Sequence, residues 1–254
     1  MLYHIEGGFG VMPRFSGKSR KGKIHCFVHR VIEPEEYLKM SDGELYDLIC
    51  RELYVNDALL GAEFKSKKSA EYLERAMYYC PECGLSEWES RGDTVSCKGC
   101  GIKVKYLPNL TLEGVNKEFK FKHIHEWYDA QSRFISSLEL DKKYESEPLY
   151  RDTVNLFDVI PYKRRKKVAK GATLSLYSNR YTLEYNGQLK EIFFDTVSSA
   201  TVLGKNKLNL YVDNDILQIK GSKRFNPLKY MHLYFHYKNI TKGVSNGELQ
   251  FLGL

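Results

Sequence analysis

The sequence predicts an α+β protein whose two halves differ in texture. In the first half, two Cys-x-x-Cys pairs predict a metal-binding ribbon, and amphipathic patterns on either side predict flanking helices. After residue 171, short alternating segments separated by turn residues predict an antiparallel β-barrel followed by one C-terminal helix. With 254 residues, 43% of them hydrophobic, the chain has room for one large domain or for two to three small ones.

The first 66 residues begin with strand-like sequence and continue into helical sequence. The stretch KIHCFVHRVI, residues 23–32, is rich in β-branched and aromatic residues and predicts a strand. EPEEY predicts a helical turn with Pro34 at its first position. Ser41 and Glu44 have the spacing of a capping box, so an amphipathic helix is expected to begin there. Its apolar face consists of Leu45, Leu48, Ile49 and Leu53.

Residues 67–140 are predicted to contain a helix, the cysteine ribbon and a second helix. Apolar residues at helical spacing predict the first helix over residues 69–79. After the ribbon, VKYL predicts a strand that ends at Pro108, and an amphipathic pattern from about His123 predicts the second helix. The apolar positions of the two helices are Ala70, Leu73, Ala76 and Met77, then Ile124, Trp127, Tyr128, Phe134, Ile135 and Leu138.

The ribbon motif consists of two cysteine pairs with thirteen residues between them. Its members are Cys80, Cys83, Cys97 and Cys100. Zn²⁺ prefers four ligands in a tetrahedron, and an all-cysteine set leaves no position for water or substrate, so a structural Zn²⁺ site is predicted. Gly84 and Gly101 directly follow the pairs, where a positive φ lets the chain turn. Cys26 and Cys50 have no partner at a useful spacing and are expected to be small buried side chains.

The remaining sequence is divided into a linker and a barrel. Residues 141–171 are interpreted as a basic linker, because DKKYESEPLYRD is polar and KRRKK is a run of five bases. Residues 172–254 contain six candidate strands, and Asn186-Gly187 is a typical hairpin turn. Asn226 and Pro227 have the positions of an N-cap and a first helical residue. Antiparallel strands followed by one helix have the layout of a pleckstrin-homology-like (PH-like) barrel.

Four stretches, in the same order, resemble a known enzyme family. They are YHIEGGFGVMPRF, RKGKIHCFVHRVIEPEEY, MSDGELYDLICRELYVNDA and KSAEYLERAMYYCPECG. Together they resemble the C-terminal half of bacterial 1-acylglycerol-3-phosphate acyltransferases, the PlsC-like phospholipid/glycerol acyltransferases, in a subgroup with a four-cysteine zinc ribbon. The resemblance covers residues 1 to about 140. It implies that residues 1–66 are the C-terminal piece of an α/β acyltransferase domain.

The resemblance implies acyl transfer from a thioester donor to a lysophosphatidate-like hydroxyl. In this family the chemistry depends on an H-x4-D pair, in which His removes the hydroxyl proton and Asp orients the His. No histidine of this chain has Asp five positions later, and no E-G-T-R block occurs. No catalytic residue is therefore assigned. The chain is expected to be a catalytically incomplete portion, inactive alone, with a separate N-terminal acyltransferase half as a partner.

Histidines provide no alternative catalytic site. His232 and His236 have the i, i+4 spacing of a metal pair but lack the glutamate of an H-E-x-x-H motif. We therefore expect the histidines to be ordinary core or surface residues.

The chain has an excess of basic residues, with a formal net charge of +7. This balance suits nucleic acid, an anionic membrane surface or phosphorylated substrates. Two clusters are candidates for contact with anionic lipid or phosphate, although such runs are often simply solvated. They comprise Arg14, Lys18, Arg20, Lys21 and Lys23 in the first, and Lys163, Arg164, Arg165, Lys166 and Lys167 in the second.

Two non-enzymatic functions remain alternatives to the acyltransferase hypothesis. One is a ribbon and barrel that dock membrane lipid or protein. The other, nucleic-acid binding by the ribbon, is disfavoured because acidic residues outnumber basic ones there. No signal segment opens the sequence and no apolar run is long enough to span a bilayer. The expected location is the cytoplasm, including the inner face of the membrane.

Overall fold

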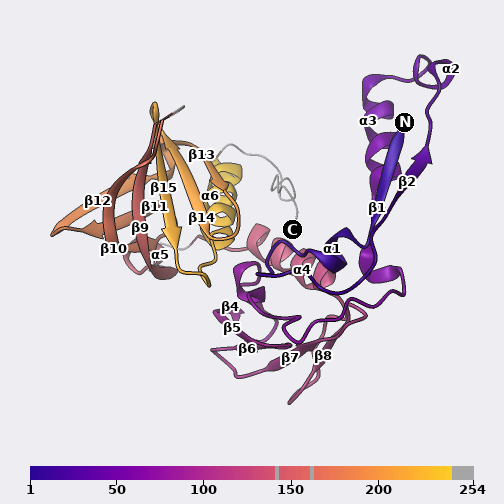
Figure 1. Cartoon of the computed structure of the whole chain (residues 1–254). Helices are drawn as coiled ribbons and strands as arrows, with labels where there is room; N and C mark the ends of the chain where they lie inside the picture. Colours follow the sequence, from indigo (N-terminus) through magenta and orange to yellow (C-terminus); the bar gives the residue numbers. More distant parts are fainter. Residues whose placement is uncertain (141–142, 161–162, 242–254) are drawn as a thin grey trace.

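The computed structural model describes residues 1–140, 143–160 and 163–241. It mixes helices and strands, as the predicted α+β class requires. Figure 1 shows three parts, which we call the arm (β1, β2, α2 and α3), the ribbon unit (β3 to β8 with α4) and the half-barrel (β9 to β15 with α6). Over the described ranges, no helix combines the length and the apolar character needed to cross a membrane.

The arm is a two-stranded antiparallel sheet with a helix on one face. Its elements are β1 (Leu2–Glu6), β2 (His25–Arg30), α2 (Pro34–Tyr37) and α3 (Asp42–Leu53). The predicted strand and the predicted capping box are confirmed, because Glu44 N–H donates to Ser41 Oγ and Ser41 N–H donates to the Glu44 carboxylate. The Glu52 backbone carbonyl on α3 lies 2.5 Å from His4 Nε2 on β1. The face that carries His4 is therefore turned towards α3.

Two short elements attach the arm to the ribbon unit. They are α1 (Gly8–Val11) and the 3₁₀ turn η1 (Asp57–Leu59). The buried Asp57 carboxylate accepts hydrogen bonds from Gly7 N–H at 2.8 Å and from Gly10 N–H at 2.9 Å. These charge-assisted bonds fix the root of the arm, whereas its far end extends away from the rest of the molecule (Figure 1).

The ribbon unit consists of two small sheets and one amphipathic helix. The pair β3 (Tyr79–Cys80) and β4 (Gly84–Leu85) forms one sheet, and a four-stranded antiparallel sheet has the order β5-β6-β7-β8. The latter strands are Trp88–Arg91, Thr94–Cys97, Lys103–Tyr106 and Leu112–Gly114. The predicted second helix is α4 (Ile124–Ser136), and its Trp127 packs against Trp88 in the core.

The helix predicted over residues 69–79 is wrong. Residues 67–76 form turns around the 3₁₀ helix η2 (Leu73–Arg75), and β3 then begins at Tyr79. Tyr72 has a φ of 72°, which interrupts a right-handed helix, and its N–H donates to Ser90 Oγ at 2.6 Å. The N–H of Ala70 donates to the Gly92 carbonyl. Two N–H groups of this segment thus bond to the ribbon sheet, while others bond within the segment as short turns instead of a continuous α-helix.

The half-barrel is a curled sheet of seven antiparallel strands with the order β12-β11-β10-β9-β15-β14-β13. The strands β9 to β12 are Tyr150–Val159, Lys166–Leu176, Arg180–Tyr185 and Gln188–Phe193. The 3₁₀ turn η3 (Phe194–Thr196) leads to β13 (Val197–Val202), β14 (Lys207–Val212) and β15 (Asp215–Gly221). All six predicted strand segments are confirmed. Asn186 and Gly187 both have positive φ, as the predicted hairpin turn requires.

The interpretation of residues 141–171 as a linker is wrong for most of their described part. After the short helix α5 (Lys143–Ser146), β9 and the first half of β10 fall within this stretch. Strand β9 is a central strand, because it pairs with β10 on one side and with β15 on the other. Its inward-facing Val154 and Leu156 are buried, whereas Arg151, Thr153 and Asn155 are more exposed. The polar positions concealed the strand in the sequence.

The C-terminal helix α6 (Leu228–Thr241) connects the half-barrel to the ribbon unit. Asn226 Oδ1 accepts from the N–H groups of Leu228 and Lys229, so the predicted N-cap is confirmed. Tyr234 packs against the sheet side and donates to the Val197 carbonyl, while other residues of the helix contact α4. The helix is buried on several sides because it lies between the two parts (Figure 1).

Candidate metal centre and basic surface

The four ribbon cysteines converge as their spacing predicts. Their sulfur atoms all lie within 4.8 Å of one another. Cys80 Sγ is 3.7 Å from Cys100 Sγ, and Cys83 Sγ is 3.9 Å from Cys97 Sγ. Both contacts join one cysteine pair to the other. Four soft ligands at mutual contact fit a single tetrahedral metal ion.

Tight turns aim the sulfurs inward. Gly84 and Gly101 have φ values of 71° and 74°, which other residues rarely adopt. Gly99 has no spare room, because a Cβ at this position would lie 3.0 Å from Cys83 Sγ. The glycines after the two pairs therefore have the role that the sequence predicted.

The electrostatics of the cluster differ from one cysteine to the next. Burial raises the pKa of the Cys80 thiol, and burial together with hydrogen bonds to Cys100 and Cys97 raises the pKa of Cys83 to about 11. Burial also acts to raise the pKa of Cys97, but Ser86 Oγ, 3.0 Å from its sulfur, and two backbone N–H groups lower that pKa to about 7. A bound cation favours the thiolate at every position, so metal affinity rises as protons leave.

Hydrogen bonds from the ribbon unit's helix hold the strand that enters the cluster. Gln131 on α4 is fully buried; its Oε1 accepts from the N–H groups of Tyr78 and Tyr79, and its Nε2 donates to the Ala76 carbonyl. The Tyr79 carbonyl accepts from the indole N–H groups of Trp88 and Trp127 at 3.2 Å and 2.9 Å. Sequence reasoning missed Gln131 and Ser86, because nothing in their local sequence distinguishes them.

A second group of metal-type ligands belongs to a helix cap. His123, His125 and Glu126 lie close together at the start of α4. The Glu126 carboxylate accepts from the N–H groups of Lys122 and His123, and it also lies 3.2 Å from His123 Nδ1. These bonds account for the cluster as the first turn of a helix.

The two unpaired cysteines differ from expectation. Cys26 and Cys50 were expected to be buried, yet both are exposed. Cys26 lies on β2, opposite Ile5, on the face of the arm that α3 does not cover. Cys50 lies on the outer side of α3. Of the two, only Cys26 would become an interior residue if another layer covered the free face of the sheet.

The first basic cluster is divided by the fold. Four of its bases are exposed, as contact with an anion requires, namely Arg14, Lys18, Lys21 and Lys23. Arg20 was expected to contact an anion, but the structure buries it: the residue is only 4% exposed. Its guanidinium donates to the Ser69 carbonyl at 2.7 Å and stacks over Tyr106. Arg20 is therefore a core residue that joins two loops and cannot contact a lipid headgroup.

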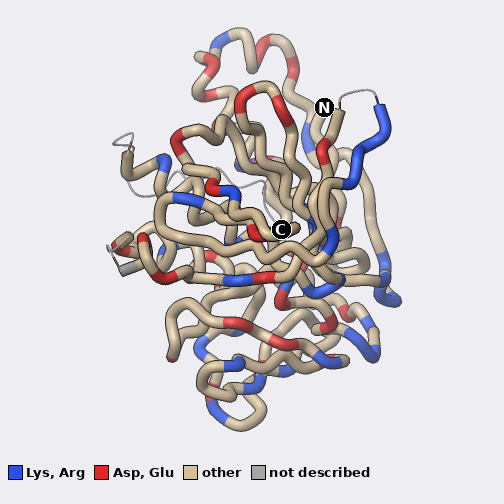
Figure 2. Tube along the Cα trace, turned by 90° about the vertical axis from the view of Figure 1, so that its left-hand side faces the viewer, with Lys and Arg blue, Asp and Glu red and all other residues tan. Residues whose placement is uncertain are grey.

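The second basic cluster, residues 163–167, lies at the start of β10 and is exposed throughout. Arg165 also donates to Gln218 Oε1 at 2.8 Å and stacks over Phe157. Figure 2 shows this run as a continuous basic stretch beside a short grey segment. The two clusters lie on different parts of the fold, one beside the arm and one on the half-barrel.

Comparisons with known proteins place few constraints on this chain. No protein-family model matches it, and no curated protein matches its sequence. Among solved structures, it is similar to the inner membrane complex sub-compartment protein 3 of Toxoplasma gondii, with 12% sequence identity and a TM-score of 0.26. That similarity covers 42% of this chain and 90% of that chain. A TM-score this low carries no information about function.

Proposed function

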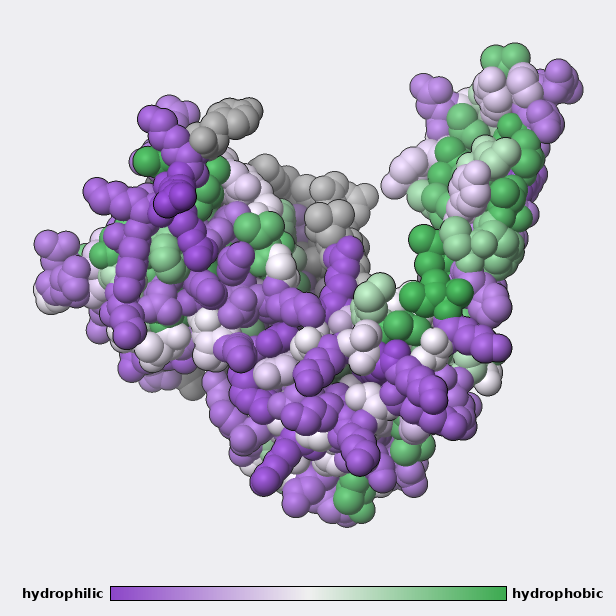
Figure 3. Space-filling model, viewed as in Figure 1, coloured by the Kyte–Doolittle hydropathy of each residue, from purple (hydrophilic) through white to green (hydrophobic). Residues whose placement is uncertain are grey.

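We propose that this chain is the C-terminal portion of a glycerophospholipid-synthesis acyltransferase, and that its arm packs against the catalytic portion. The uncovered sheet face of the arm carries the proposal. Tyr3, Ile5 and Val28 share that face and are 53%, 58% and 46% exposed. A two-stranded sheet is marginally stable in water, and an apolar sheet face normally packs against another layer. In Figure 3, hydrophobic residues extend along the arm.

The resemblance to the PlsC-like acyltransferases supports this choice of partner. The stretches YHIEGG, KIHCFVHR and SDGELYDLIC lie in and around β1, β2 and α3, so the sequence that resembles the enzymes builds the uncovered arm. The chain has no H-x4-D pair. Transfer of an acyl group from a thioester to a lysophosphatidate-like acceptor would need a general base, so His and its orienting Asp would come from the catalytic portion.

Two measurements test the proposal. One is the acyl-transfer activity of this chain, and the other is its binding to an added acyltransferase polypeptide that contains the H-x4-D pair. We expect background activity from this chain alone and a stable complex with the added polypeptide. Ile5→Asp should weaken that complex at least about tenfold, because it buries a charge in an apolar interface. The matched control is Leu189→Asp on β12, which changes a similarly exposed aliphatic residue outside the arm.

Two results would contradict the acyltransferase proposal. One is acyl transfer by the chain alone that survives controls for contaminating enzyme. The other is equal binding by the Ile5→Asp and Leu189→Asp variants, which would show that the arm face is not the interface.

We infer that the metal of the ribbon is Zn²⁺ in a structural role. A tetrahedron with Zn–S distances of about 2.3 Å separates its sulfurs by about 3.8 Å, close to the 3.7 Å and 3.9 Å separations of the cluster. Four thiolates leave no coordination position for a substrate. Cys80, Cys83, Cys97 and Cys100 would hold the ion and thereby keep the ribbon folded against α4.

A second candidate function is docking to an anionic membrane surface through the half-barrel. The favouring observation is the exposed basic run of residues 163–167. Near a charged surface, each base contributes about 1 kcal/mol. A seven-stranded curled sheet with one helix would then act as a PH-like module, and the protein would lie peripherally at the inner face of the membrane.

A further inference from the structure

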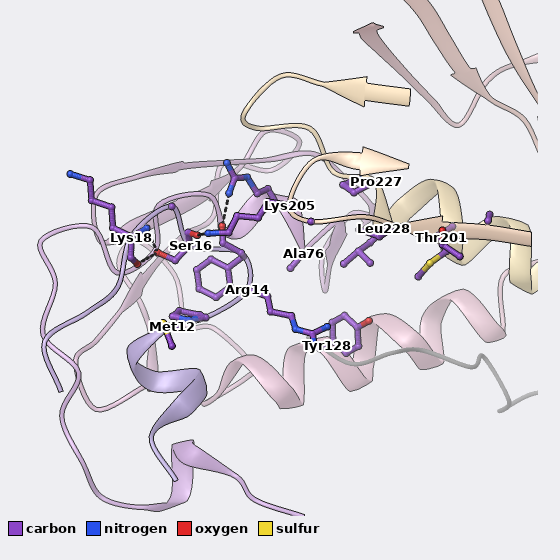
Figure 4. Close-up of a pocket in the computed structure, with 18 of the residues that line it drawn as sticks. Met12, Arg14, Ser16, Lys18, Ala76, Tyr128, Thr201, Lys205, Pro227 and Leu228 are labelled. Atoms are coloured by element: carbon purple, nitrogen blue, oxygen red, sulfur yellow. Dashed lines mark hydrogen bonds between the residues drawn. The ribbon is translucent and has the colours of Figure 1, made fainter. Parts of the chain in front are cut away.

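A cavity of about 740 Å³ lies where the N-terminal segment, the ribbon unit and the half-barrel meet. Figure 4 shows its walls, which come from residues 12–19, from α4, from β13 and the turn after it, and from α6. This volume lies within the range of about 300–1,000 Å³ that is usual for small-molecule sites. The cavity contains no part of the metal cluster and no residue of β1, β2 or α3.

Most of the cavity wall is apolar. Met12 and Phe15 face it from the N-terminal segment, and Val202 faces it from β13. From α6, Leu228, Met231 and Phe235 complete the wall. Methionine side chains adapt their shape to irregular apolar ligands. A flexible hydrocarbon chain is the ligand that such a wall accommodates.

The polar part of the cavity carries charge of one sign. Its lining residues include four bases, Arg14, Lys18, Arg75 and Lys205, and no Asp or Glu. Two of these bases fix the loop that forms the wall: Arg75 donates to the Phe15 carbonyl at 2.8 Å, and Lys205 Nζ donates to the Ser16 carbonyl. Among the described residues, no hydrogen bond or ion pair involves the exposed Lys18 ammonium.

Arg14 is the base that reaches into the cavity. In Figure 4, its side chain extends across the space towards Tyr128 on α4. Arg14 as a whole remains exposed to solvent, whereas the neighbouring Phe15 is buried. Arg14 therefore provides positive charge inside an apolar space, and Lys18 lies at its outer edge with its side chain directed away from Arg14 (Figure 4). Such an arrangement attracts an anionic group and leaves the attached chain in a dry environment.

We propose that this cavity binds a single-chain amphiphile with an anionic head, such as an alkyl phosphate. The hydrocarbon chain lies between Phe15 and the Met231 side of α6, and the head lies at Arg14. This site is independent of the proposed acyltransferase function, because it uses neither the arm face nor an H-x4-D pair. It would link the ribbon unit and the half-barrel through one bound molecule.

Calorimetric titration of the full chain tests the cavity below the micelle concentration of each ligand. The probes are dodecyl phosphate, dodecyl maltoside with the same chain and a neutral head, and inorganic phosphate with no chain. We expect dodecyl phosphate to bind one molecule per chain. Dodecyl maltoside and inorganic phosphate should each bind at least about tenfold more weakly, because each lacks one half of the interaction.

Matched charge reversals locate the head. The double variant Arg14→Glu with Lys18→Glu should weaken dodecyl phosphate binding at least about tenfold. The double variant Lys21→Glu with Lys23→Glu changes the net charge equally at exposed positions outside the cavity, and it should bind as the parent chain does. Thermal melting of both variants monitors folding.

Three results would overturn the cavity proposal. A failure of dodecyl phosphate to bind would show that the cavity does not take single-chain amphiphiles with an anionic head. Equal binding of dodecyl maltoside would show that the bases do not recognise the head. If both double variants weakened dodecyl phosphate binding equally, the ligand would be attracted by the net charge of the protein and not by a specific head-group site. Met12→Asp, at an exposed position on the apolar wall, keeps the chain side testable if the Arg14 variant does not fold.

Discussion

At the scale of single residues, His232 is an imidazole held without charge in the joint between two parts of the molecule. It is fully buried on α6, and its Nδ1 lies 2.5 Å from the Tyr78 hydroxyl. Burial lowers the pKa of His232 from its ordinary value of 6.5 to about 3. Burial lowers the pKa of His236 as well. Both residues therefore make folding depend on pH.

The sign of this dependence follows from the proton balance. Between pH 6.5 and about 3 the unfolded chain binds a proton at residue 232 that the folded chain excludes. The stability is fully present above pH 6.5 and is lost as the pH falls towards 3, by at most about 1.4 kcal/mol per pH unit. We expect His232→Gln to reduce the slope of unfolding free energy against pH by up to that amount, measured by urea denaturation between about pH 4 and pH 6.

His25→Gln is the control for this measurement, because His25 is exposed on β2. An unchanged slope in His232→Gln, or the same change in both variants, would show that His232 is not the source of the pH dependence.

Each cysteine of the metal cluster could be predicted from the sequence, whereas the residues that hydrogen-bond to the cluster and to the strand entering it could not. The four cysteines are recognisable because the two members of each ligand pair must lie on one tight turn. Gln131 and Ser86 act on backbone or sulfur atoms, and their positions in the sequence follow no such spacing. Arg20 shows the opposite error, since its charge indicated a surface position but its stem and guanidinium fill the core.

At the scale of elements, tryptophan fluorescence can report on the structure of the ribbon. The two tryptophans of the sequence, Trp88 and Trp127, both donate to the Tyr79 carbonyl beside Cys80. Removal of the metal with a strong chelator should lower the melting temperature and change tryptophan fluorescence, because the cluster no longer fixes β3. Fluorescence and near-ultraviolet circular dichroism measure this change.

Cys83→Ser should reproduce the effect of the chelator, and Cys26→Ser should not, because Cys26 lies outside the cluster. A chelator that removes the metal without altering melting or fluorescence would contradict a structural role.

Elements that depend on local signals were predicted well, and elements that depend on partners were not. Hairpin turns and the caps of α3 and α6 are local, so their sequence patterns hold. The apolar stripe over residues 69–79 is indeed core, but the N–H groups of Ala70 and Tyr72 find partners on the ribbon. Strand β9 was hidden by polar alternation, although its two neighbouring strands fix it in the sheet.

At the scale of the whole molecule, charged residues connect the half-barrel to the ribbon unit. Arg224 forms ion pairs with Glu71 at 2.7 Å and with the buried Glu74. Within the half-barrel, Lys229 on α6 pairs with Asp152 of β9 at 2.7 Å. The cavity opens beside this joint and takes its walls from segments that are far apart in the sequence. Composition and spacing therefore could not predict it.

Docking to an anionic membrane surface is also a prediction at the scale of the whole molecule. We expect the chain to sediment with phosphatidylserine vesicles and less with phosphatidylcholine vesicles. The double variant Lys163→Glu with Arg164→Glu should weaken sedimentation at least about tenfold, because it replaces attraction to the anionic surface with repulsion. The control, Lys67→Glu with Lys68→Glu, makes the same charge change at exposed positions beside the ribbon.

Equal loss in the two charge-reversal variants would contradict docking through residues 163–167. A shift of an oligonucleotide in a gel that persists at raised salt would favour nucleic acid instead of a membrane.

The order of strands also has a consequence for biosynthesis. The central strand β9 pairs with β15, the last strand of the sheet along the chain. During translation, β9 must therefore wait until residue 221 has left the ribosome, whereas the ribbon ligands within residues 80–100 emerge much earlier. A metal-loaded ribbon would therefore be compact before the half-barrel is. The half-barrel would then close late, onto a surface that is already in place.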